Sequence, residues 1–363
     1  MPNTKIKLLI TVPSLGCGGL ERNISIICNN INTDKFDVTL TILNNADQFF
    51  EITNPAIKII DLKIPSVRKS LFAIAKLSRK LKPDIILTAA NHLNLFFGIF
   101  RWLFPKRMKI IGRESSIMSK NSPTNWNPGF YNWISRKFYK KLDLVICQSV
   151  FMQDDLVHHY QFPAKQARII NNAVQPPVVN WFNTDNATGS IPKLITVARL
   201  IELKGVERLI RSVAHLTIPF EYTIIGEGEL RPGLEKLIKE LSLENKVFMP
   251  GGSDQPFAKV ANPDLFLMGS HFEGFPNVLL EANAIGIPVV AFNAPGGIGE
   301  LIINNETGIL VETENEADFA VAIVKALAYS FDRNKISTLI RNRFDVKKII
   351  HQWEDLFEEI NSQ

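Results

Sequence analysis

Short runs of apolar, largely β-branched residues recur along the whole chain and alternate with segments of helical periodicity. Each run is nearly continuous, as expected for a strand of a parallel sheet whose two faces are covered by helices. The runs are IKLLITV, DVTLTIL, IKIIDL, DIILT, KIIG and LDLVICQS in the first half, and KLITVAR, YTIIGEG, KVFMPG, DLFLMGS, IPVVAF and TGILV in the second. This alternation predicts an α/β protein with doubly wound parallel sheets.

The chain has 363 residues, which is more than one typical core requires. The stretch NNAVQPPVVNWFNTDNATGSIPK (171–193) is rich in Asn, Pro and Thr and interrupts the alternation. We therefore expect two Rossmann-like domains that face each other across a cleft. The predicted boundaries are an N-terminal domain at 1–172, a linker at 173–192, a second domain at 193–345, and a C-terminal helix at 346–363 that packs back across the interface.

Composition and cysteine usage indicate a cytoplasmic globular protein, with 46% apolar and 21% charged residues. The three cysteines are scattered along the chain without the spacing of a disulfide framework or a metal site. The run IKLLITV is short for a signal peptide and is flanked by Pro13 and Glu21, so a first strand is the better reading. No apolar stretch is long enough for a membrane-spanning helix.

Charge is distributed unevenly. Residues 1–175 contain 24 Lys and Arg against 11 Asp and Glu, whereas the remainder is acidic. A basic half indicates an anionic partner, which could be nucleic acid, a phospholipid surface or a phosphorylated substrate. Nucleic acid is disfavoured because neither an aromatic stacking platform nor a recognised binding motif is evident.

A glycine-rich segment, PSLGCGGLERN (13–23), directly follows the first predicted strand. Gly16, Gly18 and Gly19 would let the backbone approach a ligand and would open a helix whose amides attract anions. A dinucleotide fingerprint would need a third glycine where Glu21 stands, so NAD binding is disfavoured. A tight turn that binds no ligand is the alternative.

Two cations follow the first strand of the second half, in VARLIELKGVERL (197–209). Arg199 and Lys204 lie five residues apart at the carboxyl edge of a predicted parallel sheet, next to the start of a helix. This arrangement suits a diphosphate, with Gly226 in the following strand-to-helix turn. The alternative is a pair of solvated surface cations.

The segment HFEGFPNVLLEANAIGIPVV (271–290) carries two glutamates in an otherwise apolar run. Glu273 is expected in the turn after a strand, and Glu281 one to two turns into the following helix. Ionised carboxylates are rarely buried without a partner, so we expect both to contact one elongated ligand. An exposed helix position is the alternative for Glu281.

These motifs together resemble the retaining GT-B glycosyltransferase family four, also called group 1. The resemblance rests on E-(seven residues)-E in FEGFPNVLLEA, R-L-(three residues)-K-G upstream of it and G-G-(one residue)-E-R near the N-terminus. It covers nearly the whole chain, including NNAV at the domain boundary and the Trp-containing C-terminal segment. It implies two Rossmann-like domains with a nucleotide sugar bound in the cleft.

The resemblance also assigns roles. Arg199 and Lys204 would stabilise the departing diphosphate, Glu273 would face the transferred sugar, and Glu281 would hold the ribose hydroxyls. Anomeric configuration would be retained by front-face attack. The remaining donor-binding candidates are Gly18, Gly19, Gly226, Gly274, Phe275, Pro276 and Asn277.

The acceptor side departs from the family pattern. Many members carry a histidine after the fifth strand, where this chain reads IGRESSIM. Arg113 and Glu114 are the acceptor-side candidates there, together with His92 after the preceding strand, although a lone histidine can equally be structural. Glu300, in the glycine-rich segment APGGIGELI (294–302), is a weaker candidate near the sugar.

The resemblance implies a nucleotide sugar as co-substrate, a UDP-sugar rather than a GDP-sugar, with no cofactor. No Asp-x-Asp motif occurs and cations serve the leaving group, so we expect no metal. The acceptor would be a glycan on a polyprenyl diphosphate or on lipopolysaccharide. Residues 63–109 contain 11 Lys and Arg but one acid, which fits an anionic membrane surface on the inner face of the cytoplasmic membrane. Ordinary solvated helices are the alternative.

Two other classes of function stay open. A sugar-nucleotide epimerase of related two-domain shape would need acid and base groups around the sugar, and the Glu273–Glu281 spacing argues against it. A non-catalytic protein that binds anionic ligands would use the basic half alone.

Overall fold

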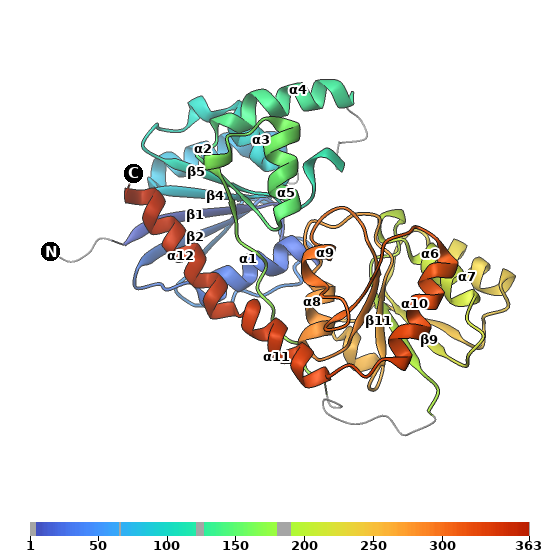
Figure 1. The fold of residues 1–363 in the computed structure, drawn as a ribbon. Coiled ribbons are helices and arrows are strands. Elements are labelled where there is room, and N and C mark those ends of the chain that lie inside the picture. Colours follow the sequence, from blue (N-terminus) through green and yellow to red (C-terminus); the bar gives the residue numbers. More distant parts are fainter. Residues whose placement is uncertain (1–4, 65–66, 121–126, 180–189, 363) are drawn as a thin grey trace. The chain divides into compact units, whose positions relative to one another are not determined.

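The computed structural model describes residues 5–64, 67–120, 127–179 and 190–362. The chain divides into two compact units (Figure 1). Unit 1 comprises Met1–Ala173 together with Val346–Gln363, and unit 2 comprises Val174–Asp345. Half of the linker predicted at 173–192 falls on residues 180–189, which lie outside the described part of the chain.

Unit 1 is built on a seven-stranded parallel sheet in the order β3-β2-β1-β4-β5-β6-β7. The strands are β1 (Ile6–Val12), β2 (Phe36–Ile42), β3 (Lys58–Asp61), β4 (Ile85–Ala89), β5 (Lys109–Arg113), β6 (Leu144–Cys147) and β7 (Ala167–Ile169). The first six are the predicted runs. The seventh was missed because the tripeptide ARI is too short to show a pattern.

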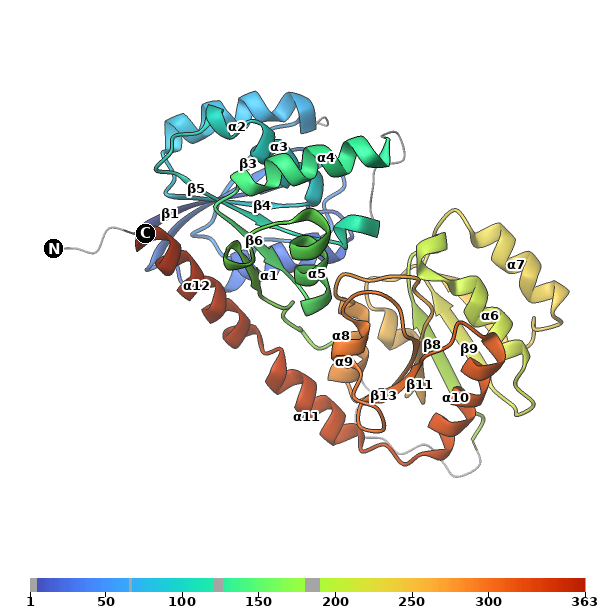
Figure 2. The same ribbon diagram turned by 45° about the horizontal axis from the view of Figure 1, so that its top comes forward.

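Helices cover both faces of this sheet, as continuous apolar strands require. They are α1 (Gly19–Asn30), α2 (Val67–Leu81), α3 (Asn91–Ile99), α4 (Pro128–Phe138), α5 (Val150–Asp154) and α12 (Val346–Ser362). Figures 1 and 2 show α1 and α12 on one face and α2, α3 and α4 on the other.

The C-terminal helix α12 completes the core of unit 1. Its apolar side chains recur at helical spacing, and Trp353 and Phe357 are buried against the α1 face of the sheet. The ring of Phe357 meets that of Phe36 edge-on at a centroid distance of 5.9 Å. A segment distant in sequence therefore supplies part of the hydrophobic core of the first domain.

Unit 2 is built on a six-stranded parallel sheet in the order β10-β9-β8-β11-β12-β13. All six strands were predicted. They are β8 (Lys193–Val197), β9 (Glu221–Ile225), β10 (Val247–Gly251), β11 (Leu265–Met268), β12 (Val289–Phe292) and β13 (Gly308–Val311).

Separate apolar clusters lie on the two faces of this second sheet. One face is covered by α6 (Val206–Ala214), α7 (Arg231–Glu240) and α10 (Glu316–Ala328). The other is covered by α8 (Asn277–Ala284), α9 (Ile298–Leu301) and α11 (Arg333–Arg343).

The predicted fold class is confirmed, because each unit is a doubly wound parallel sheet of the Rossmann type. None of the helices in the described ranges combines the length and the apolar character that crossing a bilayer requires.

Candidate functional site

Two loops at the carboxyl edge of the unit 2 sheet are joined through their backbones. One follows β8 and the other follows β11, and these strands are neighbours in the sheet. The amide of His271 donates to the carbonyl of Leu203 at 2.9 Å. A Cβ at Gly205, which has a φ of 55°, would lie 1.9 Å from the carbonyl oxygen of Gly269. Only glycine permits this close approach, so the sequence K-G fixes one loop against the other.

This contact brings Lys204 and Glu273 together. The Lys204 Nζ donates to Glu273 Oε1 at 2.5 Å, and the two side chains are 20% and 12% exposed. The hydroxyl of Ser270 donates to the same oxygen at 2.7 Å. A partly exposed ion pair at a sheet edge remains within reach of a ligand, unlike one enclosed in a core.

The backbone of Glu273 is fixed by the glycine-rich segment 294–302. The Glu273 amide donates to the carbonyl of Pro295 at 3.0 Å. The amide of Gly297 lies 3.1 Å from the carbonyls of both Glu273 and Gly274. Glu300 lies close by in sequence, on α9, and is half-buried. The turn that carries Glu273 is therefore anchored at its main chain.

The turn from Gly274 to Asn277 leads into α8. Gly274, Phe275 and Pro276 are buried, and Asn277, the first helical residue, is half-buried. The ring of Phe275 packs edge-on against Phe344 at a centroid distance of 5.6 Å. These four predicted donor-binding positions thus form the structural connection between Glu273 and the helix.

Glu281 lies in the second turn of α8 and is only 8% exposed. The alternative of an exposed helix position is therefore wrong. A carboxylate is seldom kept this far inside a protein without polar contacts.

Arg199 lies at the same sheet edge but does not join the Lys204–Glu273 pair. Its side chain is exposed, and the described residues include no bond from its guanidinium to Glu273. Gly226 packs against this loop, because a Cβ there would lie 1.8 Å from the carbonyl oxygen of Ala198. The two cations predicted to bind the diphosphate thus lie on one loop. Lys204 is paired with Glu273, and Arg199 faces solvent.

The predicted N-terminal loop of unit 1 has a carboxylate folded over it. Gly18 is the N-cap of α1 and Gly19 its first residue. A Cβ at Gly18 would lie 2.2 Å from Glu21 Oε2, so the Glu21 side chain turns back over the start of the helix. A glutamate at the third helical position commonly does this. A phosphate that binds here would have to displace Glu21.

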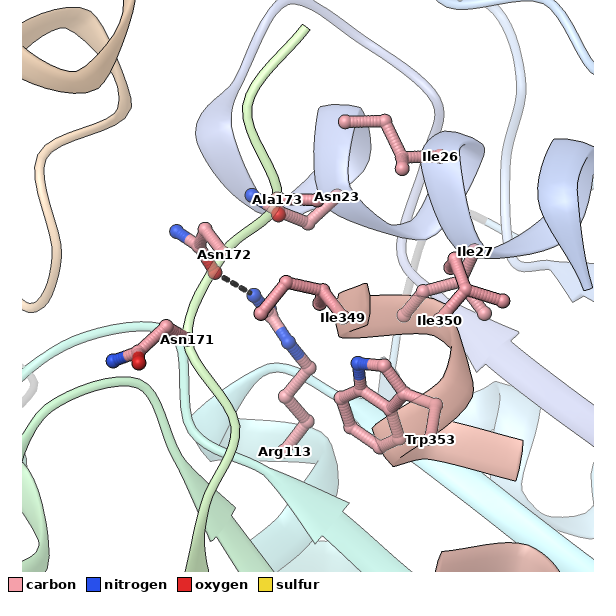
Figure 3. Close-up of a pocket in the computed structure, with 10 residues that line it drawn as sticks. All are labelled: Asn23, Ile26, Ile27, Arg113, Asn171, Asn172, Ala173, Ile349, Ile350 and Trp353. Carbon is pink, nitrogen blue, oxygen red and sulfur yellow. Dashed lines mark hydrogen bonds between the residues drawn. The ribbon is translucent and has the colours of Figure 1, made fainter. Parts of the chain in front are cut away.

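Arg113, one of the acceptor-side candidates, is buried at the end of β5 with 2% exposure. Its Nη2 donates to Asn172 Oδ1 at 2.7 Å, while Nη1 has no hydrogen-bond partner among the described residues. The side chain lines a small pocket that includes Asn23, Ile349 and Trp353 (Figure 3). Burial lowers the pKa of Arg113 to about 10.

Glu114, the next residue, is also buried, with 1% exposure. Its Oε1 accepts from Asn94 Nδ2 at 2.8 Å, whereas Oε2 accepts no hydrogen bond in the part of the chain described. Burial raises the pKa of this carboxyl to about 7. Both neighbours therefore lie inside unit 1 and not on its surface.

His92, in contrast, is exposed in the first turn of α3. The residue that caps this helix, Ala90, has a φ of 137°, a conformation that L residues rarely adopt. The amide of Ser115 and its hydroxyl donate to Asn91 Oδ1 at 3.0 and 2.9 Å. His92 therefore lies on the surface, whereas Arg113 and Glu114 are buried.

Sequence reasoning missed two residues at the unit 2 edge. Ser270 is 2% exposed and donates a hydrogen bond to Glu273. The one feature of the sequence that could have indicated it is its position three residues before Glu273 in the same turn. The Nε and Nη2 of Arg208 donate to the carbonyls of Gly269 and Ser270, each at 2.6 Å. No described group of three or more His, Cys, Asp or Glu side chains has the arrangement of a metal site.

Two family models match the chain. The family described as Glycosyltransferase Family 4 matches residues 17–176, and the one described as Glycosyl transferases group 1 matches residues 181–343.

Two relatives from Campylobacter jejuni are named as N-acetylgalactosaminyltransferases. One is the N-acetylgalactosamine-N,N'-diacetylbacillosaminyl-diphospho-undecaprenol 4-alpha-N-acetylgalactosaminyltransferase, which is 30% identical over 85% of this chain and 87% of its own. The other is the GalNAc-alpha-(1->4)-GalNAc-alpha-(1->3)-diNAcBac-PP-undecaprenol alpha-1,4-N-acetyl-D-galactosaminyltransferase, which is 22% identical over 98% of this chain and 99% of its own.

Solved structures share the fold. The lipopolysaccharide outer core galactosyltransferase WaaB superposes with a TM-score of 0.79 at 19% identity, covering 97% of this chain and 99% of its own. Anabaena HepE in complex with UDP superposes with a TM-score of 0.76 at 20% identity, covering 98% of this chain and 100% of its own. With the relatives and the two family models, this shows that the chain belongs to the group 1, family 4 glycosyltransferases and has their GT-B fold.

Proposed function

We propose that the chain is a retaining glycosyltransferase that moves a sugar from a nucleotide diphosphate sugar to a lipid-linked glycan in surface-polysaccharide biosynthesis. One observation carries this proposal. Lys204 and Glu273, from loops after two different strands, meet with partly exposed side chains at the carboxyl edge of the unit 2 sheet. Ligands of doubly wound sheets bind at that edge.

The chemistry follows from the charges at this edge. The bond between the anomeric carbon and the diphosphate oxygen breaks, and the ammonium of Lys204 and the guanidinium of Arg199 stabilise the charge on the leaving phosphate. The acceptor hydroxyl attacks the same face, and its proton passes to the departing phosphate oxygen. Glu273 contacts the transferred sugar and Glu281 the ribose hydroxyls. Because two cations serve the leaving group, the reaction needs neither a metal nor a cofactor.

The names of the relatives support the substrates that we propose. Two are named for transfer of N-acetylgalactosamine to glycans on undecaprenyl diphosphate, and HepE was solved with UDP. We therefore propose a UDP-linked N-acetylhexosamine or hexose as donor. The acceptor is a glycan on a polyprenyl diphosphate or on lipopolysaccharide.

The test is turnover of a panel of UDP- and GDP-sugars by the purified protein. UDP release that requires a glycan-lipid acceptor, persists in EDTA and forms an α-linkage from an α-linked donor supports the proposal. Isomerisation of the donor sugar would identify an epimerase instead. Salt-sensitive oligonucleotide binding without turnover would identify a binding protein.

We further propose that unit 1 docks on an anionic membrane through its α2–α4 face. Large aromatic side chains are exposed there: Phe72 on α2, Trp102 after α3, and Phe130 and Trp133 on α4 are between 53% and 74% exposed. The Lys137 Nζ lies 5.1 Å from the centroid of the Trp133 ring. Exposed Trp and Phe among basic side chains suit the interface of an anionic bilayer.

Sedimentation with vesicles that contain phosphatidylglycerol tests this surface. Replacing Trp102 and Trp133 with Ser should lower the bound fraction at least severalfold by removing the aromatic anchors. Replacing the exposed cations Lys76, Arg79, Lys80 and Lys82 with Ser should also lower the bound fraction. Added salt should have the same effect as losing these cations, but it should not reproduce the effect of losing the two tryptophans. Unchanged sedimentation of both variants would contradict membrane docking.

A further inference from the structure

The hydroxyl of Ser270 and the ammonium of Lys204 share one acceptor. Both donate to Glu273 Oε1, at 2.7 and 2.5 Å, and within the described part of the chain neither bond uses Oε2. Ser270 is only 2% exposed, so its hydroxyl is shielded from water. A buried hydroxyl that donates to a carboxylate is a strong, charge-assisted contact.

Ser270 is also held rigidly. The Arg208 side chain donates to the carbonyls of Gly269 and Ser270, each at 2.6 Å. Its guanidinium carbon lies 4.1 Å from the centroid of the Phe292 ring, which orients the guanidinium plane. On the other side, the His271 amide bonds the carbonyl of Leu203. The backbone that carries the Ser270 hydroxyl is therefore held in place, whereas the Lys204 ammonium lies at the end of a flexible side chain.

A bound diphosphate would disturb these two donors differently. Diphosphate oxygens carry more negative charge than one carboxylate, so they would draw the Lys204 ammonium away from Glu273. Ser270 carries no charge and cannot follow the phosphate. Glu273 would then keep one donor on Oε1 while Oε2 accepts a hydrogen bond from a sugar hydroxyl.

We propose that Ser270 is a positioning residue, which keeps the Glu273 carboxylate oriented toward the sugar once the diphosphate has engaged Lys204. This inference rests on the proposed function and adds to it. The nucleotide is held by other groups, so Ser270 acts on the rate of transfer and not on nucleotide affinity.

The test compares Ser270→Ala, Ser270→Cys and Ser270→Thr. UDP affinity is measured by calorimetry, and turnover by UDP release from UDP-N-acetylgalactosamine, UDP-N-acetylglucosamine and UDP-glucose with a glycan-lipid acceptor. The Ala and Cys variants should lose about 10- to 100-fold in kcat, because the carboxylate loses its fixed donor, while the Kd for UDP changes less than about twofold. The Thr variant, which keeps the hydroxyl, should stay within about threefold of the wild-type kcat.

Ser337→Ala is the matched control. Ser337 is a buried serine of the same unit whose hydroxyl donates to the carbonyl of Ala284 at 2.7 Å, so the substitution removes a buried serine hydrogen bond away from Glu273. Its kcat should equal that of the wild type. The Cys variant tests the loss of the hydroxyl in the same way as the Ala variant, but its sulfur atom fills the space of the serine oxygen, so no cavity is left.

Two results would overturn the inference while the proposed function stands. The first is a Ser270→Ala enzyme with wild-type kcat. The second is a loss of UDP affinity parallel to the loss of kcat, which would place Ser270 in nucleotide binding or in the fold. A wild-type protein that neither binds UDP nor releases it from any donor would refute the proposed function itself.

Discussion

Acidic and basic side chains lie near the carboxyl edge of both sheets, but in opposite environments. In unit 2, Lys204 and Glu273 are 20% and 12% exposed and hold each other. In unit 1, Arg113 and Glu114 are 2% and 1% exposed, and each is bonded to a different amide. The first pair can exchange its partner for a ligand, whereas the second is enclosed by protein.

Burial acts on the two charges of unit 1 in the same sense. It lowers the pKa of Arg113 and raises the pKa of Glu114, so it favours the neutral form of each. Charges in such a place cost stability unless their polar atoms are satisfied, and Nη1 and Oε2 have no partner among the described residues. The comparison teaches that activity should depend on the unit 2 pair, and stability on the unit 1 pair.

The largest expected effect is on the rate of transfer. Lys204→Ala or Glu273→Ala should reduce kcat by about 10²–10³-fold or more, because a charge that acts on the transition state is lost. In Lys204→Ala the free energy of unfolding should change by no more than about 1 kcal/mol, because the ion pair is partly exposed. Glu273→Ala should cost about 1–3 kcal/mol, because it leaves the buried Ser270 hydroxyl without its acceptor. Steady-state UDP release and urea denaturation measure the two quantities.

Lys236→Ala is the control for this prediction. Lys236 pairs with Glu240 at 3.3 Å on the exposed side of α7, so its loss should leave kcat unchanged. Near-normal rates in the Lys204 and Glu273 variants would contradict the claim that activity depends on this ion pair.

The next effect is on the pH dependence of stability. The folded pKa of Glu114, about 7, lies above an unfolded value of about 4.3, so the folded state binds the extra proton between these values. The stabilisation that this raised pKa gives to the folded state is fully present below about pH 4.3 and is lost as the pH rises through 7. Glu114→Gln abolishes this loss. Relative to the wild type, the variant should gain about 2–3 kcal/mol of unfolding free energy between pH 5 and pH 8, measured in urea. Parallel pH profiles would contradict it.

The smallest effect concerns the partner of Arg113. Asn172→Ala should lower the free energy of unfolding by about 2 kcal/mol, because it leaves a buried guanidinium with fewer hydrogen bonds. Asn293→Ala, which removes an exposed bond to Glu312, should cost less than about 0.5 kcal/mol. If Asn172→Ala and Asn293→Ala prove equally stable, the guanidinium of Arg113 must instead be hydrogen-bonded in solution by water or by a ligand.

The architecture could be predicted because its cause is local. Strands covered on both faces must be apolar throughout, so the runs identified every strand except the three-residue β7. The meeting of Lys204 and Glu273 could be expected for a related reason: their loops follow neighbouring parallel strands.

Burial at the sheet edge could not be predicted from the sequence. Arg113 and Glu114 directly follow an apolar run, which suggests an exposed loop, and what encloses them comes from distant segments such as Asn172 and α12. Likewise, nothing in the sequence indicated that Arg208 reaches the carbonyls of Gly269 and Ser270. These contacts depend on the tertiary arrangement and not on any local pattern.

The position of α12 has a consequence for biosynthesis. Trp353 and Phe357 fill the core of unit 1, yet they are translated after every strand of both sheets. On the ribosome, the first domain must therefore wait with an apolar face uncovered while the second is made. Helix α12 can close that face only after unit 2 has been made.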